Sequence, residues 1–259
     1  MGPQGCIQEC LGCEATNEFK LYPSKDVAKD DSQQMMYSLE ESTFCCRFCC
    51  MNNREFTQTV WLGNKDTKSD VVLKMARPFA FAPPGQNCCC FVPLNFKPCM
   101  QTLSMTKADD SPLADIEIPC AICVPALKIK DPAGTIQYSL SQPTCLGGMC
   151  INPFAEGLCN CKVPFYIYKE GVPATDGNQV GKIVKLWRGL GTEVFTDAAS
   201  FQVDFPADAN AEMKTAIMGS TFFINMCAPR TCSAHMLWRR LARVACGLAV
   251  CRAPCASLT

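Results

Sequence analysis

The sequence predicts a mainly β protein with one buried helix close to its C-terminal part. Short runs of β-forming residues recur along the chain, and turn-forming residues separate them. Helical patterns are scarce before residue 209, where a long apolar stretch follows. This succession of strands favours an all-β sandwich or barrel, and 259 residues suffice for one large β domain.

The predicted strands are grouped in pairs. The first two runs, 18–22 and 34–40, are joined by the polar stretch 23–32. A hairpin turn is expected at 63–66 (Gly-Asn-Lys-Asp) and another at 131–134 (Asp-Pro-Ala-Gly). A third turn is expected around Asp176-Gly177, a pair that favours positive φ. The remaining predicted strands are 56–61, 70–75, 126–130, 135–140, 163–168, 180–187 and 200–205.

The predicted helix covers residues 209–226. Good helix formers open it, and Pro229 ends it. Its uncharged part, 215–228, is apolar nearly all round, so it must lie in a protein core or in lipid. Because a membrane span needs about 20 apolar residues, we favour a buried central helix, with a span as the alternative. Its central side chains are Ile217, Phe222, Phe223 and Ile224.

Asp197 and Asp208 bracket a window of the length of a calcium loop. An EF-hand loop needs an oxygen ligand at its third position and glycine at its sixth, where this chain has Ala199 and Gln202. Apolar and polar residues alternate within the window, which favours a strand. A weak calcium site that uses Asp197, Asp204 or Asp208 is the alternative.

The 22 cysteines are the unusual feature of the composition. Residues 1–13 have neither the basic start nor the apolar run of a secretory signal, so disulfides are not expected. Pairs with Cys-x-x-Cys spacing could hold Zn²⁺ if two of them meet in space. The candidate zinc ligands, a minority interpretation, are Cys46, Cys49, Cys120 and Cys123.

Three consecutive cysteines suit a different chemistry. Cys88, Cys89 and Cys90, with Cys99 nearby, fit zinc poorly but could carry several fatty acyl chains. One acyl chain anchors a protein marginally, whereas two anchor it stably. The residues therefore predict S-acylation here, with plain burial of thiols as the alternative.

The composition argues against two classes of function. Lys and Arg together number 24, as do Asp and Glu, so a dedicated nucleic-acid binder is not expected. His235 is the only histidine and it lies in the basic tail, so we predict no catalytic residues and no enzyme.

The tail itself, 228–259, contains five arginines and no acid. Its leucines and valine have helical spacing, and arginines lie between them, which is typical of a membrane-surface helix. An ill-ordered extension with accidental periodicity is the alternative. The predicted membrane-contact residues are Arg239, Arg240 and Arg243.

Several stretches resemble the phospholipid scramblases. The most specific are VGKIVKLWRG (180–189), FTDAASFQVDFP (195–206) and AEMKTAIMGSTFFI (211–224). The order of FCCRFCC, REFTQTVW, ARPF and CCC is similar to the N-terminal half of the family. The resemblance runs from about residue 14 to residue 227. It divides the chain into a short Cys-containing segment (1–13), a scramblase domain (14–227) and a basic tail (228–259).

The resemblance implies a tubby-like fold, a closed barrel of about twelve antiparallel strands around a central hydrophobic C-terminal helix. It implies calcium-stimulated, ATP-independent, bidirectional movement of phospholipids between leaflets. It also implies palmitoylation of the cysteine run at 88–90 and a calcium segment at 197–208, where Ala199 replaces the usual acid. A phospholipid membrane is the expected partner, and the cytoplasmic face of the plasma membrane is the expected location. If the helix is buried in the barrel, scrambling needs homo-oligomers, bilayer thinning or an indirect role. The alternatives are a tubby-like lipid-binding or adaptor module and a soluble zinc-stabilised β protein.

Overall fold

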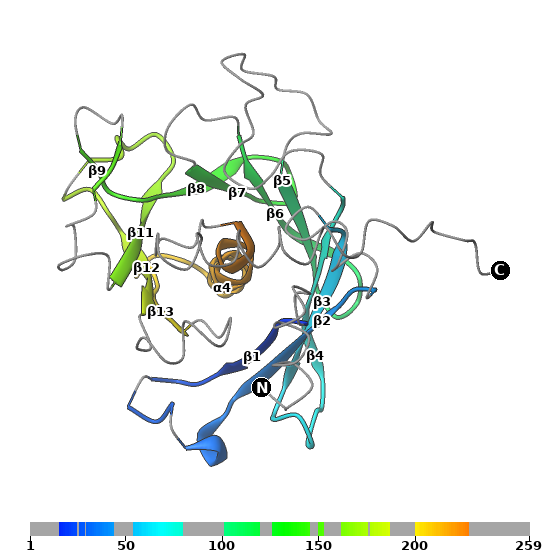
Figure 1. Ribbon diagram of the computed structural model, residues 1–259. Helices are drawn as coiled ribbons and strands as arrows, with labels where there is room; N and C mark the ends of the chain where they lie inside the picture. The colour runs from blue at the N-terminus through cyan, green and yellow to red at the C-terminus, as the bar shows by residue number, and fades with distance from the viewer. Residues whose placement is uncertain are drawn as a thin grey trace, which may run out of the picture.

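The computed structural model shows a mainly β fold, as the sequence predicts (Figure 1). The structure describes residues 16–24, 26–28, 30–43, 54–79, 101–119, 126–145, 150–152, 162–175, 177–186 and 200–227. The large sheet contains β1 (Glu18–Leu21), β2 (Met36–Glu41), β3 (Phe56–Leu62), β4 (Val71–Arg77), β5 (Gln101–Thr106), β6 (Pro112–Ile118), β7 (Ala126–Lys130), β8 (Ile136–Ser141), β11 (Lys162–Lys169), β12 (Gly181–Leu186) and β13 (Ser200–Asp204). The other elements are η1 (Asp31–Gln33), β9 (Thr144–Cys145), β10 (Cys150–Ile151) and the helix α4 (Ala211–Cys227).

The large sheet is an antiparallel meander of 11 strands. Each strand pairs with the next one along the sheet, and only the small β9–β10 hairpin interrupts the chain order, between β8 and β11. The hydrogen bonds of the described strands do not join β13 to β1, so they form an open sheet. The described strands therefore do not show the closed barrel of about twelve strands that the resemblance implies.

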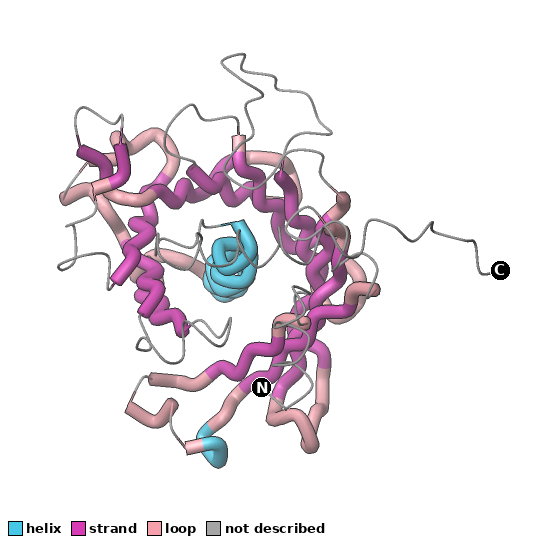
Figure 2. Tube along the Cα trace, in the orientation of Figure 1, coloured by secondary structure: helices cyan, strands magenta, loops and turns pink. Residues whose placement is uncertain are grey.

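The helix α4 lies in the middle of the curled sheet (Figures 1 and 2). It begins two residues later than predicted, because the side-chain oxygen of Asn210 caps it by accepting a 2.8 Å hydrogen bond from the backbone N–H of Met213. The expectation of a buried helix is confirmed, since Ile217 and Phe223 are 0% exposed. In the part of the chain that the structure describes, no helix is long and apolar enough to cross a bilayer.

The helix approaches the sheet closely at Gly219. A Cβ atom built on Gly219 would collide with the sulfur of Met105 on β5. It would also lie 3.4 Å from the sulfur of Met75 on β4 and 3.5 Å from a methyl group of Leu73. The missing side chain therefore lets the helix backbone pack directly on the apolar side chains of β4 and β5.

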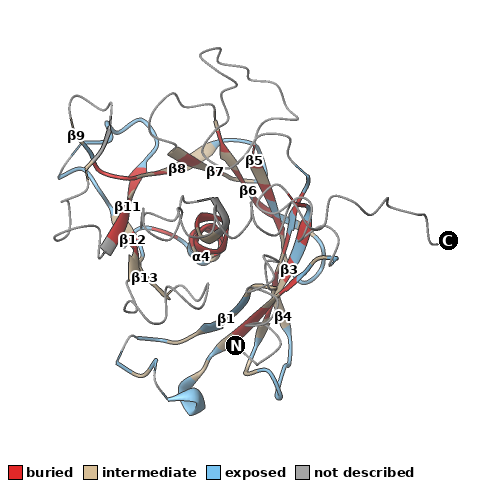
Figure 3. Ribbon diagram, in the orientation of Figure 1, coloured by how far each residue is buried: buried red, intermediate tan, exposed pale blue. Residues whose placement is uncertain are grey.

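Buried residues alternate with less buried ones along strands such as β5, as expected when one face of the sheet is turned toward α4; Figure 3 colours each residue by its burial. The turns that connect the strands are largely those predicted. The side chain of Asn64 accepts hydrogen bonds from the backbone of Asp66 (2.9 Å) and Thr67 (2.8 Å). Gly134 and Gly177 adopt positive φ, of 82° and 94°.

Two neighbouring strands, β5 and β6, were not predicted. Apolar and polar residues alternate in both strands, and this pattern is visible in the sequence. The apolar residues are buried: Leu103 and Met105 in β5, and Ile116 and Ile118 in β6. The turn between them places the non-glycine residue Asp110 at φ 62°, and this turn has no glycine to mark it. Strands β9 and β10 were also missed, since two residues cannot display a period.

Substitution of Phe223 by alanine tests the central position of α4. The ring is fully buried, and its removal leaves a cavity that the enclosing sheet cannot easily collapse. We expect the free energy of unfolding to fall by about 3–5 kcal/mol. The control, Lys214→Ala on the exposed side of the same helix, is expected to change it by less than about 0.5 kcal/mol. Urea unfolding followed by circular dichroism measures both, and equal effects would contradict the central position.

Candidate functional site

A group of polar side chains, built around a buried ion pair with partly buried residues beside it, lies where α4 ends, and sequence reasoning did not identify it. It consists of Asn17, Glu40, Ser42, Arg54 and Asn225, and we call it the buried polar cluster. Asn17 and Arg54 lie just before β1 and β3, Glu40 and Ser42 lie in and just after the end of β2, and Asn225 lies in the last turn of α4. The cluster therefore ties the edge of the sheet to the end of the central helix.

Glu40 and Arg54 form a two-pronged ion pair at the centre of this cluster. The Nε atom of Arg54 donates to Oε1 of Glu40 at 2.8 Å, and its Nη2 atom donates to Oε2 at 3.0 Å. The side chains are only 1% and 0% exposed. Two parallel charge-assisted hydrogen bonds fix the mutual orientation of these groups more tightly than a single contact would.

The remaining members complete the hydrogen bonding of the Glu40 carboxylate. The hydroxyl of Ser42 donates to Oε1 at 2.8 Å, and the backbone N–H of Asn17 donates to Oε2 at 3.2 Å. The amide side chain of Asn17 also donates to Oε2. Asn225 of α4 donates to the side-chain oxygen of Asn17 at 3.4 Å, so the carboxylate is linked to the helix through one intermediate residue.

The surroundings of Glu40 determine its ionisation. Burial by itself raises the pKa of this carboxyl group, because it disfavours the charged form. The hydrogen bonds and the positive charge of Arg54, together with Ser42 and Asn17, outweigh burial and hold the pKa below its usual range. Glu40 is therefore an anion at neutral pH, as its pairing with Arg54 requires.

A second buried arginine, Arg77 at the end of β4, lies beside the same part of α4. Its guanidinium carbon is 5.9 Å from the centroid of the Phe56 ring and 5.9 Å from that of the Phe223 ring. Its Nη2 atom donates to the side-chain oxygen of Gln101 on β5. The positive charge thus contacts the faces of two core aromatic rings, an arrangement that is favourable when the charge is desolvated.

The sequence carries only a weak signal for these residues. Glu40 is in phase with the buried Ser38 on β2, so the alternation places an acid on the inward face. An acidic side chain on the inward face needs a buried hydrogen-bonding or charged partner. No local pattern, however, indicates that Arg54, beyond the β2–β3 connection, is that partner.

In the structure, two of the three predicted calcium ligands accept hydrogen bonds from protein side chains. Asp208 accepts a 2.7 Å hydrogen bond from Lys169, which is the main cause of its lowered pKa. Asp204 accepts a 3.2 Å hydrogen bond from Gln202. Asp197 lies outside the described residues. Among those that are described, no three His, Cys, Asp or Glu side chains come together as a metal site.

The other predicted site residues lie outside the described part of the chain, so their predictions stand untested. They are the acylation candidates Cys88, Cys89, Cys90 and Cys99, the zinc candidates Cys46, Cys49, Cys120 and Cys123, and the tail arginines Arg239, Arg240 and Arg243. The predicted helix residues Ile217, Phe222, Phe223 and Ile224 are described, and all are buried.

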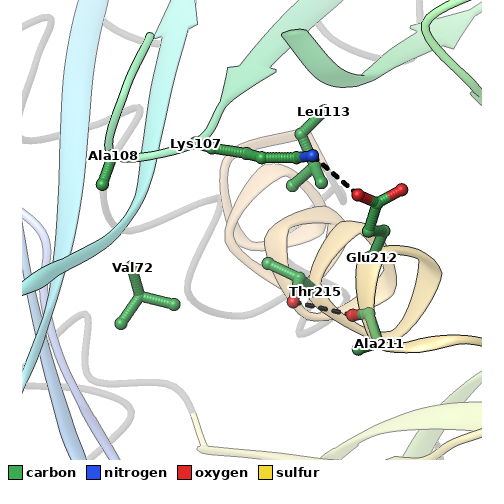
Figure 4. Close-up of a pocket in the computed structure, with 7 residues that line it drawn as sticks. All are labelled: Val72, Lys107, Ala108, Leu113, Ala211, Glu212 and Thr215. Carbon is green, nitrogen blue, oxygen red and sulfur yellow. Dashed lines mark hydrogen bonds and ion pairs between the residues drawn. The ribbon is translucent and has the colours of Figure 1, made fainter. Parts of the chain in front are cut away.

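A recess of about 330 Å³ lies at the opposite end of α4, where the helix begins (Figure 4). Its walls include Val72, Leu113 and the methylene chain of Lys107. The ammonium group of Lys107 is 2.6 Å from a carboxylate oxygen of Glu212, and this ion pair crosses the recess. The recess is small and wide open. The charges of Lys107 and Glu212 neutralise one another, so neither the shape nor the charge of the recess selects a particular ligand.

These features define a class of β protein in which one antiparallel sheet is built around a C-terminal helix. The scramblase family model matches residues 6–227, which is most of this chain. The chain therefore belongs to the scramblase family. No solved structure matches it.

Curated relatives agree with the family match. Phospholipid scramblase 2 of Bos taurus is 26% identical over 220 residues, which cover 85% of this chain and 63% of that protein. Phospholipid scramblase 1 of Homo sapiens is 27% identical over 222 residues, which cover 85% of this chain and 58% of that protein. Phospholipid scramblase 2 of Homo sapiens is 27% identical over 214 residues, or 62% of its length. The chain thus spans less than two thirds of the length of these relatives.

Substitution of Glu40 by glutamine tests the buried polar cluster. Loss of the carboxylate leaves the charge of Arg54 buried without its anion, so the free energy of unfolding should fall by about 3–5 kcal/mol at neutral pH. Because the folded-state pKa of Glu40 is lowered, this contribution is present above the unfolded-state pKa and is lost as the pH falls through the folded-state pKa. The difference between wild type and variant should therefore shrink as the solution is acidified below about pH 4.5.

Glu41→Gln is the matched control, because Glu41 is the next residue of β2 and is exposed. We expect it to change the free energy of unfolding by less than about 0.5 kcal/mol. Urea titrations at several pH values measure all three proteins. A cost for Glu40→Gln that is as small as that of Glu41→Gln, or that does not depend on pH, would show that the ion pair contributes little.

Proposed function

We propose that this protein is a phospholipid scramblase that moves phospholipids between membrane leaflets, in both directions and without ATP. The observation that carries the proposal is the match to the scramblase family over residues 6–227. The relatives are named phospholipid scramblases, and the described fold agrees with the resemblance in its one central hydrophobic helix. The protein would act at the cytoplasmic face of a membrane, with the plasma membrane as the expected location.

The position of α4 limits the mechanism. Its apolar side chains contact the sheet, so in this fold they are not available to line a path for lipids. The Phe222 ring of α4 packs against the Phe19 ring of β1, with ring centroids 4.8 Å apart. The edge strand β1 therefore covers this side of the helix. The closed twelve-stranded barrel that the resemblance implies would complete this cover between β13 and β1. Scrambling would then proceed by perturbation of the bilayer from its surface or through homo-oligomers.

Acylation would hold the protein at the membrane. Thioesters at two or more of Cys88, Cys89, Cys90 and Cys99 would anchor the chain stably, because each buried methylene group adds about 0.8 kcal/mol. The basic tail, through Arg239, Arg240 and Arg243, would add attraction to anionic lipids. Both contributions come from segments outside the described residues, and the support for them is the sequence alone.

A lipid-binding or adaptor module without transport activity is the second candidate. The observation that favours it is again the burial of α4, which leaves this fold without an obvious lipid path. Both candidates bind membranes, so binding does not separate them, whereas movement of lipid between leaflets does.

A liposome assay tests the proposed activity. The full chain is reconstituted without ATP into vesicles that carry a fluorescent phospholipid in both leaflets, and dithionite is added outside. Dithionite destroys only the exposed label, so scrambling is expected to expose the inner-leaflet label and increase the loss of fluorescence above that of protein-free vesicles. A trapped water-soluble dye controls for leakage. No added loss, with or without calcium, would reject the scramblase and favour the adaptor module.

We also propose a weak calcium site that uses Asp197, Asp204 or Asp208. Asp208 would have to leave its ion pair with Lys169 before it could bind the ion, and this competition supports only a low affinity. Zinc bound by Cys46, Cys49, Cys120 and Cys123 remains a minority alternative, and metal analysis of the purified chain checks it.

Substitutions at the Lys169–Asp208 pair test the calcium proposal. Isothermal titration of wild type should show calcium binding only in the millimolar range, and Asp208→Asn should weaken it several-fold because a ligand charge is lost. Lys169→Ala should strengthen it, because the carboxylate is then free of its competing cation. Asp131→Asn, in a turn on another hairpin, is the control and should change nothing. The absence of calcium heat even at millimolar ion would eliminate the site.

A further inference from the structure

The meander divides the connections of the sheet between two ends. Because neighbouring strands are antiparallel, successive connections lie alternately at one end and at the other. At the first end β2, β4, β6, β8 and β12 finish, and α4 also finishes there, as its Asn225 contact with Asn17 shows. We call this the cysteine end, for the reason that follows, and the opposite one the turn end.

All 22 cysteines belong to segments that are attached at one end. The segments attached at the cysteine end that contain cysteines are 1–17, 42–55, 78–100, 119–125, 142–161 and 227–259. The connections at the turn end contain none, and they are 22–35, 63–70, 107–111, 131–135, 170–180 and 205–210. Segments far apart in sequence thus bring the same chemistry to one end of the fold.

Charge is sparse in three of the segments attached at the cysteine end, whereas 42–55 and the cysteine-free connection 187–199, also attached there, contain three charged residues each. Lys97 is the only charged residue in 78–100, Glu156 is the only one in 142–161, and 119–125 has none. At the turn end, the short connections 63–70 and 107–111 are rich in lysine and aspartate. Contact with a bilayer favours apolar segments with few charges, whereas contact with water favours the opposite.

The described residues at the cysteine end agree with this division in part. Glu40 and Arg54 are buried and paired with one another, whereas the neighbouring Glu41 and Glu55 are exposed. Phe79, just beyond β4, is 41% exposed and opens the apolar segment 78–100. A single exposed phenylalanine is ordinary on a protein surface, so Phe79 is informative only because of the segment it opens.

We propose that the cysteine end docks on the phospholipid bilayer, so that the C-terminal end of α4 points toward the membrane and the turn end faces the solvent. A bilayer fits this end because its thiols could carry several acyl chains beside one another. The tail, with five arginines and no acid, also starts there and complements an anionic leaflet. This inference rests on the proposed function, which supplies the membrane.

Two phenylalanines with the same exposure allow a matched test. Phe79 lies at the cysteine end and Phe205 at the turn end, and each is 41% exposed. The full chain from eukaryotic cells, with its thioesters retained, is floated with vesicles of phosphatidylcholine and phosphatidylserine at limiting lipid. Phe79→Glu is expected to lower the partition coefficient about tenfold, because an inserted phenyl ring is replaced by a charge. Phe205→Glu is expected to leave it unchanged.

Hydrogen exchange of the wild type provides a second measurement, which stands even if a variant fails to fold. Vesicles should protect backbone amides next to the cysteine end, such as those of Glu55 and Phe79, and should not protect the amides of the turns 63–70 and 107–111. Protection confined to the turns, or a larger loss for Phe205→Glu, would overturn the orientation. If wild type floats and both variants float equally, only the orientation is overturned. If wild type does not float, the proposed membrane function fails with it.

Discussion

The enclosure of α4 is the constraint on which the rest of the structure depends. A helix that is apolar on all sides cannot be satisfied by one flat surface, because a flat sheet covers only one of its faces. The 11-stranded sheet therefore curls around it (Figure 3). Gly219 sets how closely the helix and the sheet approach, since any side chain there would displace Met105.

The end of α4 adds a polar condition to this apolar packing. Arg54 and Arg77 lie in the interior near the last turns of the helix; Arg54 is paired with the carboxylate of Glu40, and Arg77 donates to the neutral side chain of Gln101. A buried ion pair such as Arg54–Glu40 adds little net stability, but a wrong register would leave each charge without its partner. We therefore interpret the Arg54–Glu40 pair, linked to Asn225 through Asn17, as a contact that fixes the position of the helix along the sheet.

The meander also gives the molecule two chemically different ends. An antiparallel order requires the connections to alternate, so every second connection can carry one kind of residue and the rest another. The described turns at one end are short and closed by their own side chains, such as Asn64 and Asp131. Most of the segments at the other end are longer, and all the cysteines belong to segments attached there. A protein that works at a membrane surface can use this polarity to separate its lipid contacts from its solvent-facing turns.

The sequence by itself determined the features that depend on neighbouring residues. Strand β7, the turns at Asn64 and Gly134 and the burial of α4 all follow from period, turn chemistry and apolar composition over a few residues. Only the tertiary structure revealed the contact of Asn17 with Asn225, 208 residues apart, and the pairing of Glu40 with Arg54 across a connection. The reason is physical: periodicity states which way a side chain faces but not which distant side chain it meets, and that depends on how the whole sheet curls around the helix.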